Sequence, residues 1–394
     1  MSDLKIFTKN IEEKAMEQIN TLIALPVFSQ CKVRIMPDVH AGSGCVIGFT
    51  ADLGDKVIPT VVGVDIGCGL LAAEIREEYI DYKKLDSVIH AHVPSGFNVN
   101  NTGSKTAIKL IGLLRCKDSL HNTDRLVRSL GTLGGGNHFI EIDRDEDGVA
   151  YLVIHTGSRN VGLQVANYYQ DVAIDKWHGK NARKQSNEEI INKLKAEGRE
   201  KEISAALKDR ESQLSDIPKQ LCYLEGEDRE NYLHDMDVCQ LFARLNRVKI
   251  AKRIFNQMNW SCKNIIHSVH NYIDFEDNIV RKGAIAARNG EELIIPMNMR
   301  DGCIIGVGKG NDDWNQSAPH GAGRIMSRTE AKKHVSMQEY QDSMQGIYTT
   351  SVDESTLDEC PMAYKPMKEI VDLIEPTVEI KKIIKPVYNF KAAE

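Results

Sequence analysis

The sequence predicts an α+β fold in a single large domain spanning residues 1–394, with mixed sheets and one charged helical insertion at 179–219. Short apolar runs typical of strands alternate with Gly-rich turns, and turns that carry chemically active residues occur in both halves of the chain. Longer segments with apolar residues at helical spacing lie between them. With 394 residues, 42% of them hydrophobic, the chain is long enough to bury a large core.

Helices are expected where apolar residues recur at roughly helical spacing. Residues 1–28 show this pattern until Pro26 interrupts it, and residues 235–258 show it over a longer stretch. The insertion at 179–219 is dense in Glu, Lys and Arg, which is typical of a solvated helical hairpin; a mobile arm over a substrate groove is the alternative. Strands are expected at residues 31–36, 46–49, 57–62, 70–75 and 150–155.

Charge and composition exclude several classes of protein. The formal charge is −6, from 50 Lys and Arg against 56 Asp and Glu, so contact with nucleic acid requires a local basic patch. The charged N-terminal segment does not resemble a secretory signal, and the apolar runs are far shorter than the ~20 residues that cross a bilayer. Nine cysteines without a Cys-x-x-Cys pair predict reduced thiols and a cytoplasmic protein with no membrane partner.

Five metal-ligating side chains lie in or beside turns at the ends of predicted strands: Asp65, Cys68, His138, His155 and His270. A carboxylate, a thiol and three imidazoles are a plausible ligand set for one or two divalent first-row metals, and zinc and manganese both suit it. Two metals that share a thiolate lie close enough to flank one phosphate, which suits displacement at phosphorus. Each residue taken alone is more often an ordinary buried side chain, and only their joint occurrence favours a metal site.

A further histidine, His320, precedes a Gly-Ala-Gly turn and Arg324. Small residues beside an imidazole let backbone N–H groups approach phosphate oxygens, and imidazole is a competent nucleophile toward phosphorus. A Gly-rich turn with an incidental histidine is the alternative. Asp38 and His40 form either an Asx turn with a capping histidine or a pair that supports the site. The GVGKG segment at 306–310 lacks the spacing of a phosphate-binding loop.

Eight short motifs occur in order along nearly the whole chain. They are DVH at 38–40, GVDIGCG at 63–69, GGGNHFIE at 134–141, HTGSR at 155–159, YLEG at 223–226, HNY at 270–272, PHGAGR at 319–324 and KPVYNFK at 385–391. Together they resemble the RtcB family of RNA-splicing ligases. Any one of these motifs is weak evidence, but the ordered series is highly specific.

The resemblance implies a distinctive α+β fold built around a deep active-site cleft. It also implies an enzyme that uses GTP and manganese to join an RNA 3′-phosphate or 2′,3′-cyclic phosphate to a 5′-hydroxyl. His320 matches the catalytic histidine that attacks the α-phosphorus of GTP and becomes covalently guanylylated. Carried over by position, Cys68 bridges two Mn²⁺ ions, of which one is bound by Asp65, Cys68 and His138 and the other by Cys68, His155 and His270.

The resemblance further implies a nucleotide site around the catalytic histidine. Phosphate contacts are expected from Asn137 and Arg324, and guanine contacts from Glu141 and Lys391, with Tyr364 stacked nearby. The full set of expected nucleotide-binding residues is Asn137, His138, Phe139, Ile140, Glu141, His270, Asn271, Pro296, Met297, Asn298, Met299, Cys303, His320, Gly321, Ala322, Gly323, Arg324, Tyr364 and Lys391.

The segment PMNMRDGC at 296–303 departs from the pattern common in the family, which reads Gly-Ser-Met-Gly and ends on a serine. This departure suggests a divergent subgroup, and both tRNA splicing and the repair of damaged RNA stay open as its role. We expect a monomer whose partners are GTP and RNA with the ends named above. The alternatives are a dinuclear metal-dependent phosphoesterase without a covalent nucleotide, and an inactive RNA-binding scaffold. A basic strip for RNA is expected from Arg159, Lys180, Arg183, Lys184, Arg281 and Arg288.

Overall fold

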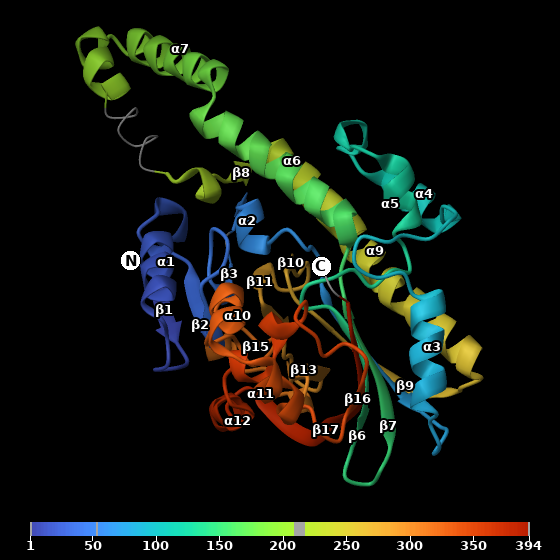
Figure 1. Cartoon of the computed structure of the whole chain (residues 1–394). Helices are drawn as coiled ribbons and strands as arrows, with labels where there is room; N and C mark the ends of the chain where they lie inside the picture. The colour runs from blue at the N-terminus through green and yellow to red at the C-terminus, as the bar shows by residue number, and fades with distance from the viewer. Residues whose placement is uncertain (1, 53, 209–216, 393–394) are drawn as a thin grey trace.

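The computed structural model describes residues 2–52, 54–208 and 217–392, apart from the side chains of residues 180–186 (Figure 1). The strands are β1 Asp3–Ile6, β2 Lys32–His40, β3 Ile47–Asp52, β4 Lys56–Val57, β5 Gly69–Ile75, β6 Phe139–Arg144, β7 Ala150–Thr156, β8 Leu224–Glu225, β9 Cys262–Val269, β10 Tyr272–Ile273, β11 Ile279–Lys282, β12 Ala284–Ala286, β13 Glu292–Asn298, β14 Gly302–Gly308, β15 Ser317–Pro319, β16 Tyr348–Thr349 and β17 Val378–Lys391. The α-helices are α1 Glu13–Ile23, α2 Pro59–Val62, α3 Tyr82–His92, α4 Lys105–Leu113, α5 Thr123–Arg128, α6 Arg159–His178, α7 Lys180–Ala196, α9 Gly226–Met258, α10 Arg328–His334, α11 Met337–Ser343 and α12 Met367–Ile374.

Two mixed sheets form the framework of the molecule. The larger has the strand order β13-β14-β17-β6-β7-β5-β9, with β16 paired to β17, and the smaller has the order β1-β2-β3-β11-β10. Strand β13, at one end of the larger order, also contacts β9 at the other end, so this sheet is curled. The expected α+β class with mixed sheets is therefore confirmed.

Both faces of the larger sheet are buried, because alternate side chains of each strand point to opposite faces. Leu71 and Ala73 of β5 pack with apolar residues of α3 and α9, whereas Leu70 and Ala72 pack with residues of β13 and β14 on the other side. Burial on both faces accounts for the nearly continuous apolar character of β5, in which only Glu74 is not fully buried. One apolar core therefore lies inside the curled sheet, between β5 and strands β13 and β14. A second core lies on the other face of the sheet, against helices α3 and α9.

Three predicted elements differ from those observed. The strand predicted at 57–62 is the short β4 followed by helix α2, because Pro59 has no N–H for a strand ladder and suits the first turn of a helix. The first 28 residues contain strand β1, paired in parallel with β2, before helix α1 begins at Glu13. The long helix predicted at 235–258 begins earlier, at Gly226, and forms α9.

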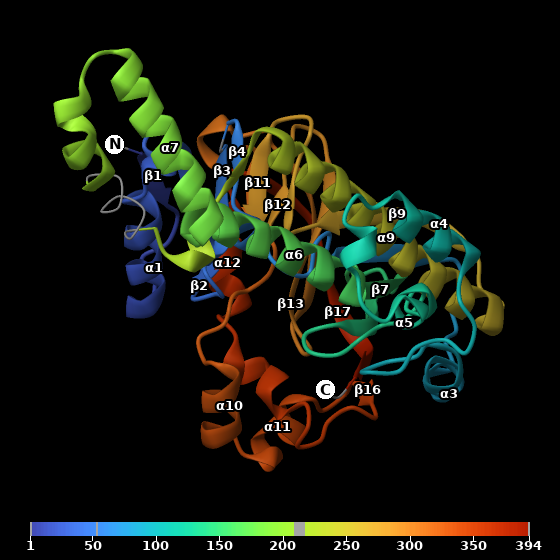
Figure 2. The same cartoon turned by 90° about the horizontal axis from the view of Figure 1, so that it is seen from above.

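The predicted insertion at 179–219 contains helix α7, which extends beyond the two sheets (Figure 1). Gly179 separates it from α6, because its backbone is extended, with φ −67° and ψ 143°. Helix α6 itself packs along α9, as both views show (Figure 2). Residues 209–216 lie outside the described residues, so the complete hairpin stays a prediction. Among the described helices, none combines the length and apolar character needed to cross a membrane.

Candidate active site

Four neighbouring strands of the larger sheet have ends on the same side of that sheet, and a metal-ligating side chain lies at each of these ends. Cys68 immediately precedes β5 and His138 immediately precedes β6, whereas His155 lies near the end of β7 and His270 directly follows β9. The register pairs the first residues of β5 with the last residues of β7 and β9, and the first residue of β6 with His155. Because neighbouring strands run antiparallel, side chains from four distant segments of the chain come together.

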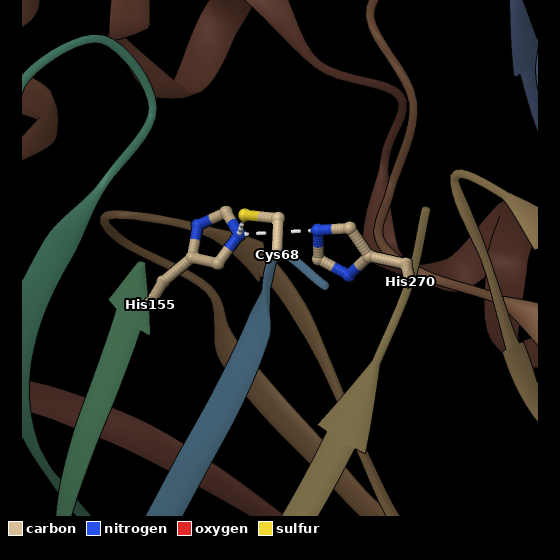
Figure 3. A group of neighbouring side chains, drawn as sticks. All are labelled: Cys68, His155 and His270. Atoms are coloured by element: carbon tan, nitrogen blue, oxygen red, sulfur yellow. Dashed lines mark hydrogen bonds between the residues drawn. The ribbon is translucent and has the colours of Figure 1, made fainter. Parts of the chain in front are cut away.

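The ligating side chains form two groups that share Cys68. In the first group, Cys68 Sγ lies 3.3 Å from His155 Nε2, which lies 3.3 Å from His270 Nε2 (Figure 3). In the second group, Cys68 Sγ lies 3.4 Å from His138 Nε2, which lies 3.0 Å from Asp65 Oδ2. The ligand atoms of each group lie within 4.8 Å of one another. Each group therefore offers three donor atoms to one cation.

Backbone carbonyls orient two of the imidazoles toward Cys68. The Nδ1–H of His155 donates to Asn137 O at 3.0 Å, and Nδ1 of His138 lies 3.0 Å from Leu133 O. This leaves the Nε2 lone pair of His155 facing the thiol, and His138 presents the same lone pair in its neutral form with the proton on Nδ1, which is the usual arrangement of metal-binding histidines. Burial and neighbouring imidazoles lower the pKa of His155 and of His270 well below the ordinary value, so both rings are neutral and able to donate a lone pair.

The two remaining ligand candidates, Asp65 and Cys68, differ in ionisation. Burial by itself raises the pKa of Asp65, but the hydrogen bond and charge of His138 and the charge of Arg159 lower it to about 2. Burial and the nearby Asp65 raise the pKa of the Cys68 thiol well above its usual value. A bound cation reverses the second shift, because a coordinating thiol is deprotonated. This donor set fits the divalent metals expected from the sequence.

His320 lies beside the first ligand group, with its ring centroid 4.8 Å from that of His270. Its Nδ1–H donates to Oδ2 of the buried Asp38 at 2.6 Å, and its backbone N–H donates to the same oxygen at 3.2 Å. Asp38 and His40 both belong to strand β2, so the interpretation as an Asx turn is wrong, and Asp38 is the member of the pair that contacts His320. Because Nδ1 carries the proton, the Nε2 of His320 keeps its lone pair.

A cavity of about 290 Å³ opens beside His320. Of the expected nucleotide-binding residues, those that line it are Asn137, Phe139, Glu141, Pro296, Met297, Asn298, Met299, His320, Gly321, Ala322, Gly323, Arg324, Tyr364 and Lys391. His155 of the first ligand group also lines it, so the cavity and the metal-ligating side chains adjoin. Three further lining residues, which no motif pointed to as nucleotide contacts, are His40, Arg328 and Glu359.

Glu359 organises the wall of this cavity. Its carboxylate accepts hydrogen bonds from Lys391 Nζ at 2.9 Å, Tyr364 Oη at 2.6 Å and Arg324 Nη1 at 3.1 Å. Burial alone raises the pKa of Glu359, but the charges of Lys391, Arg324 and Arg328 lower it to about 2. Glu359 lies in no recognisable motif, so only the structure could find it; it fixes the three side chains that the sequence placed around the nucleotide.

Five expected nucleotide-binding residues do not line the cavity. His138 and His270 point into the ligand groups described above. Ile140 packs into the apolar core with residues of α3 and α9, on the opposite face of β6 from Glu141. The carboxamide of Asn271 accepts from the Gly283 N–H at 2.9 Å and contacts the Asp65 carbonyl, so it supports a turn. Cys303 is fully buried in β14, beside Glu141 and Asp143.

Among the side chains that the structure describes, the expected basic strip is not assembled as predicted. Arg281 is fully buried and forms an ion pair with Asp277 at 2.7 Å, and Arg288 is paired with Asp274, Asp277 and Glu291. Acidic residues close in sequence neutralise both cations, so Arg281 in particular is not an RNA contact. Arg159 turns inward, with Nη1 3.2 Å from His138 Nδ1. The side chains of Lys180, Arg183 and Lys184 lie outside the described residues.

Comparison with known proteins agrees with this geometry. The family model described as "tRNA-splicing ligase RtcB" matches residues 18–115 and 112–392. The RNA-splicing ligase RtcB of Escherichia coli K12 is 30% identical over an alignment of 429 positions, which covers 97% of this chain and 96% of that protein. The tRNA-splicing ligase RtcB of Aeropyrum pernix is 27% identical and is covered to 89%, and that of Archaeoglobus fulgidus is 26% identical and is covered to 88%. The chain therefore belongs to the RtcB family of RNA ligases.

Proposed function

We propose that this RNA ligase joins an RNA 3′-phosphate or 2′,3′-cyclic phosphate to a 5′-hydroxyl, using GTP and two Mn²⁺ ions, through a covalent guanylate on His320. The proposed setting is tRNA splicing or RNA repair, and the departure of the segment at 296–303 from the family pattern is the feature that points to repair. The observation that carries the proposal is the position of His320. Its Nε2 lone pair is available where the lined cavity meets the metal-ligating groups.

The chain's own residues support each part of this chemistry. Asp38 holds the proton of His320 on Nδ1, so that Nε2 attacks the α-phosphorus of GTP and pyrophosphate leaves. A 2′,3′-cyclic end is first hydrolysed: water adds to phosphorus and the 2′ oxygen leaves, which gives a 3′-phosphate. An oxygen of this 3′-phosphate then bonds to the phosphorus of GMP, and the bond from that phosphorus to His320 breaks. The 5′-hydroxyl finally displaces GMP to form the phosphodiester. These steps require positioning and neutralisation of charge rather than further covalent chemistry.

Two groups of side chains would hold the metals, namely Asp65, Cys68 and His138, and Cys68, His155 and His270. Bound there, the cations would neutralise phosphate charge during displacement at phosphorus. The nucleotide base is proposed to lie against Glu141, whose carboxylate, when ionised, accepts hydrogen bonds from the donor edge of guanine. Arg324 contacts the ring of Tyr364 at 5.1 Å and is the proposed phosphate partner in the same cavity. A monomeric state and a cytoplasmic location stay predictions.

Labelling with GTP tests the proposal. Wild-type protein incubated with α-³²P-labelled GTP and Mn²⁺ should acquire acid-labile, protein-bound label, and the same protein should join the two RNA ends named above. His320→Ala should lose the label completely, because no other nucleophile is proposed. His334→Ala, which changes an exposed histidine of α10, is the matched control and should keep it. A phosphoesterase would release phosphate from RNA ends without any protein label, and that result would overturn the proposal.

A further inference from the structure

A third group of metal-ligating side chains lies inside the curled sheet, apart from the two groups that share Cys68. It consists of Glu141, Asp143 and Cys303, each of which offers one ligand atom, and these atoms lie within 4.8 Å of one another. Glu141 and Asp143 are alternate residues of β6, so their side chains point to the same face of the sheet. Cys303 comes from β14 and packs in the apolar core inside the curled sheet, together with Phe139 of β6.

All three of these side chains are removed from water. Asp143 and Cys303 are fully buried, and Glu141 is only 2% exposed. Burial and the neighbouring Glu141 raise the pKa of Asp143 well above its usual value, and burial and the two carboxyl groups do the same to the pKa of the Cys303 thiol. Two carboxyl groups and a thiol inside an apolar core are costly for the fold unless a positive charge balances them.

Asp143 is the residue that points to a ligand. Neither of its carboxylate oxygens has a hydrogen-bond partner among the described residues, although the side chain is fully buried. Within the same part of the chain, Oδ1 of the buried Asn389 is also without a partner, while its Nδ2 donates to Glu141. Because buried polar atoms are nearly always paired, orphaned oxygens beside a thiol fit the coordination of a cation.

The donor types favour zinc over manganese at this place. A thiolate is a soft ligand that zinc binds well, and zinc also accepts carboxylate oxygens, whereas manganese is the weakest binder of the first-row divalent series. The segment at 296–303 ends on Cys303 instead of the serine of the family pattern, and this departure supplies the soft donor of the group. Glu141 also lines the cavity beside His320, which gives a cation a path to the group.

We infer that Glu141, Asp143 and Cys303 form a third metal site, which binds one Zn²⁺ and links β6 to β14. The cation bonds to the sulfur of Cys303 and to one oxygen of each carboxylate, and the protons that these groups carry pass to solvent. A bound cation also keeps Glu141 ionised, which is the state that accepts hydrogen bonds from a base in the adjoining cavity. The site is distinct from the two groups proposed to hold Mn²⁺ and does not depend on the proposed function.

The first test uses Co²⁺ in place of Zn²⁺, because a thiolate bound to Co²⁺ gives an intense charge-transfer band in the near ultraviolet. Full-length Cys68→Ala protein, in which neither of the other two groups keeps a thiol, should show this band with Co²⁺ and lose it when Zn²⁺ is added. Adding Cys303→Ser should abolish the band. Adding Cys222→Ser, which changes a buried thiol outside the three groups, is the matched control and should leave it. No band in Cys68→Ala, or a band that survives Cys303→Ser, would overturn the inference.

The second test counts bound metal in protein that keeps Cys68. After equilibrium dialysis against Zn²⁺, the wild type should hold one more zinc ion per chain than Cys303→Ser, as measured by atomic emission. Asp143→Asn should show the same loss, whereas Asp86→Asn, which changes a buried carboxylate bonded to Tyr388, should hold as much zinc as the wild type. Unchanged zinc content in Cys303→Ser or in Asp143→Asn contradicts the site. If GTP fails to label His320 while zinc content depends on Cys303, the proposed function fails and the metal site stands.

Discussion

Asp38 shows how one buried carboxylate determines what a neighbouring imidazole does. It is fully buried, and its Oδ2 accepts from both the ring and the backbone N–H of His320. Such a carboxylate fixes the tautomer of the imidazole and stabilises positive charge that develops on it, although it never touches the substrate. Asp38 is therefore a positioning residue for the proposed guanylylation.

Replacing Asp38 by Asn should slow guanylylation of His320 by about 10²–10⁴-fold, because the amide can present its NH₂ group to Nδ1 and favour the wrong tautomer. The rate of label incorporation at saturating GTP measures this effect. Binding of Mn²⁺ should be unchanged, since Asp38 belongs to neither ligand group. Asp86→Asn alters a buried carboxylate bonded to Tyr388 and should leave the rate within about twofold. An Asp38→Asn protein labelled at the wild-type rate would contradict the assigned role.

At the scale of elements, the turn between β7 and α6 determines how Asp65 reaches the ligand group. A Cβ on Gly157 would lie only 2.2 Å from Asp65 Oδ1, and the Ser158 N–H donates to that oxygen at 3.1 Å. The glycine of the HTGSR motif thus makes room for a carboxylate that comes from another turn. The sequence motif carries no sign of this, because the two residues are more than ninety positions apart.

Gly157→Ala should weaken Mn²⁺ binding about 10- to 100-fold, which is the usual effect of disturbing a group that orients a metal ligand. Titration calorimetry of the purified protein with Mn²⁺ measures the change. Gly112→Ala is the matched control, because a Cβ at this position of α4 meets nothing within 4 Å, and it should bind Mn²⁺ as the wild type does. Equal affinities for the two variants would show that Asp65 is not a ligand.

At the scale of the whole molecule, the ligand groups connect segments that are far apart in the chain. Their five members lie between positions 65 and 270 of the chain, and they come together where strands β5, β6, β7 and β9 lie next to one another. A cation bound only by the folded state stabilises it by mass action, at about 2.7 kcal/mol when its concentration is 100 times the Kd. Metal binding and global stability are therefore linked in this protein.

Adding Mn²⁺ should raise the Tm of the wild-type protein by a few degrees, and chelation with EDTA should reverse the rise. Cys68→Ala should abolish the response and the GTP labelling together, because both ligand groups lose their shared member. Cys262→Ala, at the far end of β9, should respond as the wild type does. Each variant is compared with itself with and without metal, so its basal stability cancels. Full metal occupancy and labelling in Cys68→Ala would rule out the bridging role.

Much of the site was predictable because its chemistry lies in short motifs. Asp65, Cys68, His138, His155 and His270 were all identified from turns at predicted strand ends, and the structure brings them together. The prediction was wrong at Arg281, which the fold buries in an ion pair with Asp277. It was also wrong at residues 57–62, where Pro59 begins a helix in an apolar run that resembles a strand. Glu359 was missed because three distant donors, not its neighbours in the sequence, make it important.

By itself, the sequence determined the family, the α+β class and the identity of the candidate ligands, because these depend on residue types at short, ordered spacings. Only the tertiary structure decided that Asp38 orients His320 and that Glu359 holds one wall of the cavity beside His320. Those relations arise from strand register and from the packing of loops on helices. Both join residues separated by tens to hundreds of positions, so no local pattern encodes them.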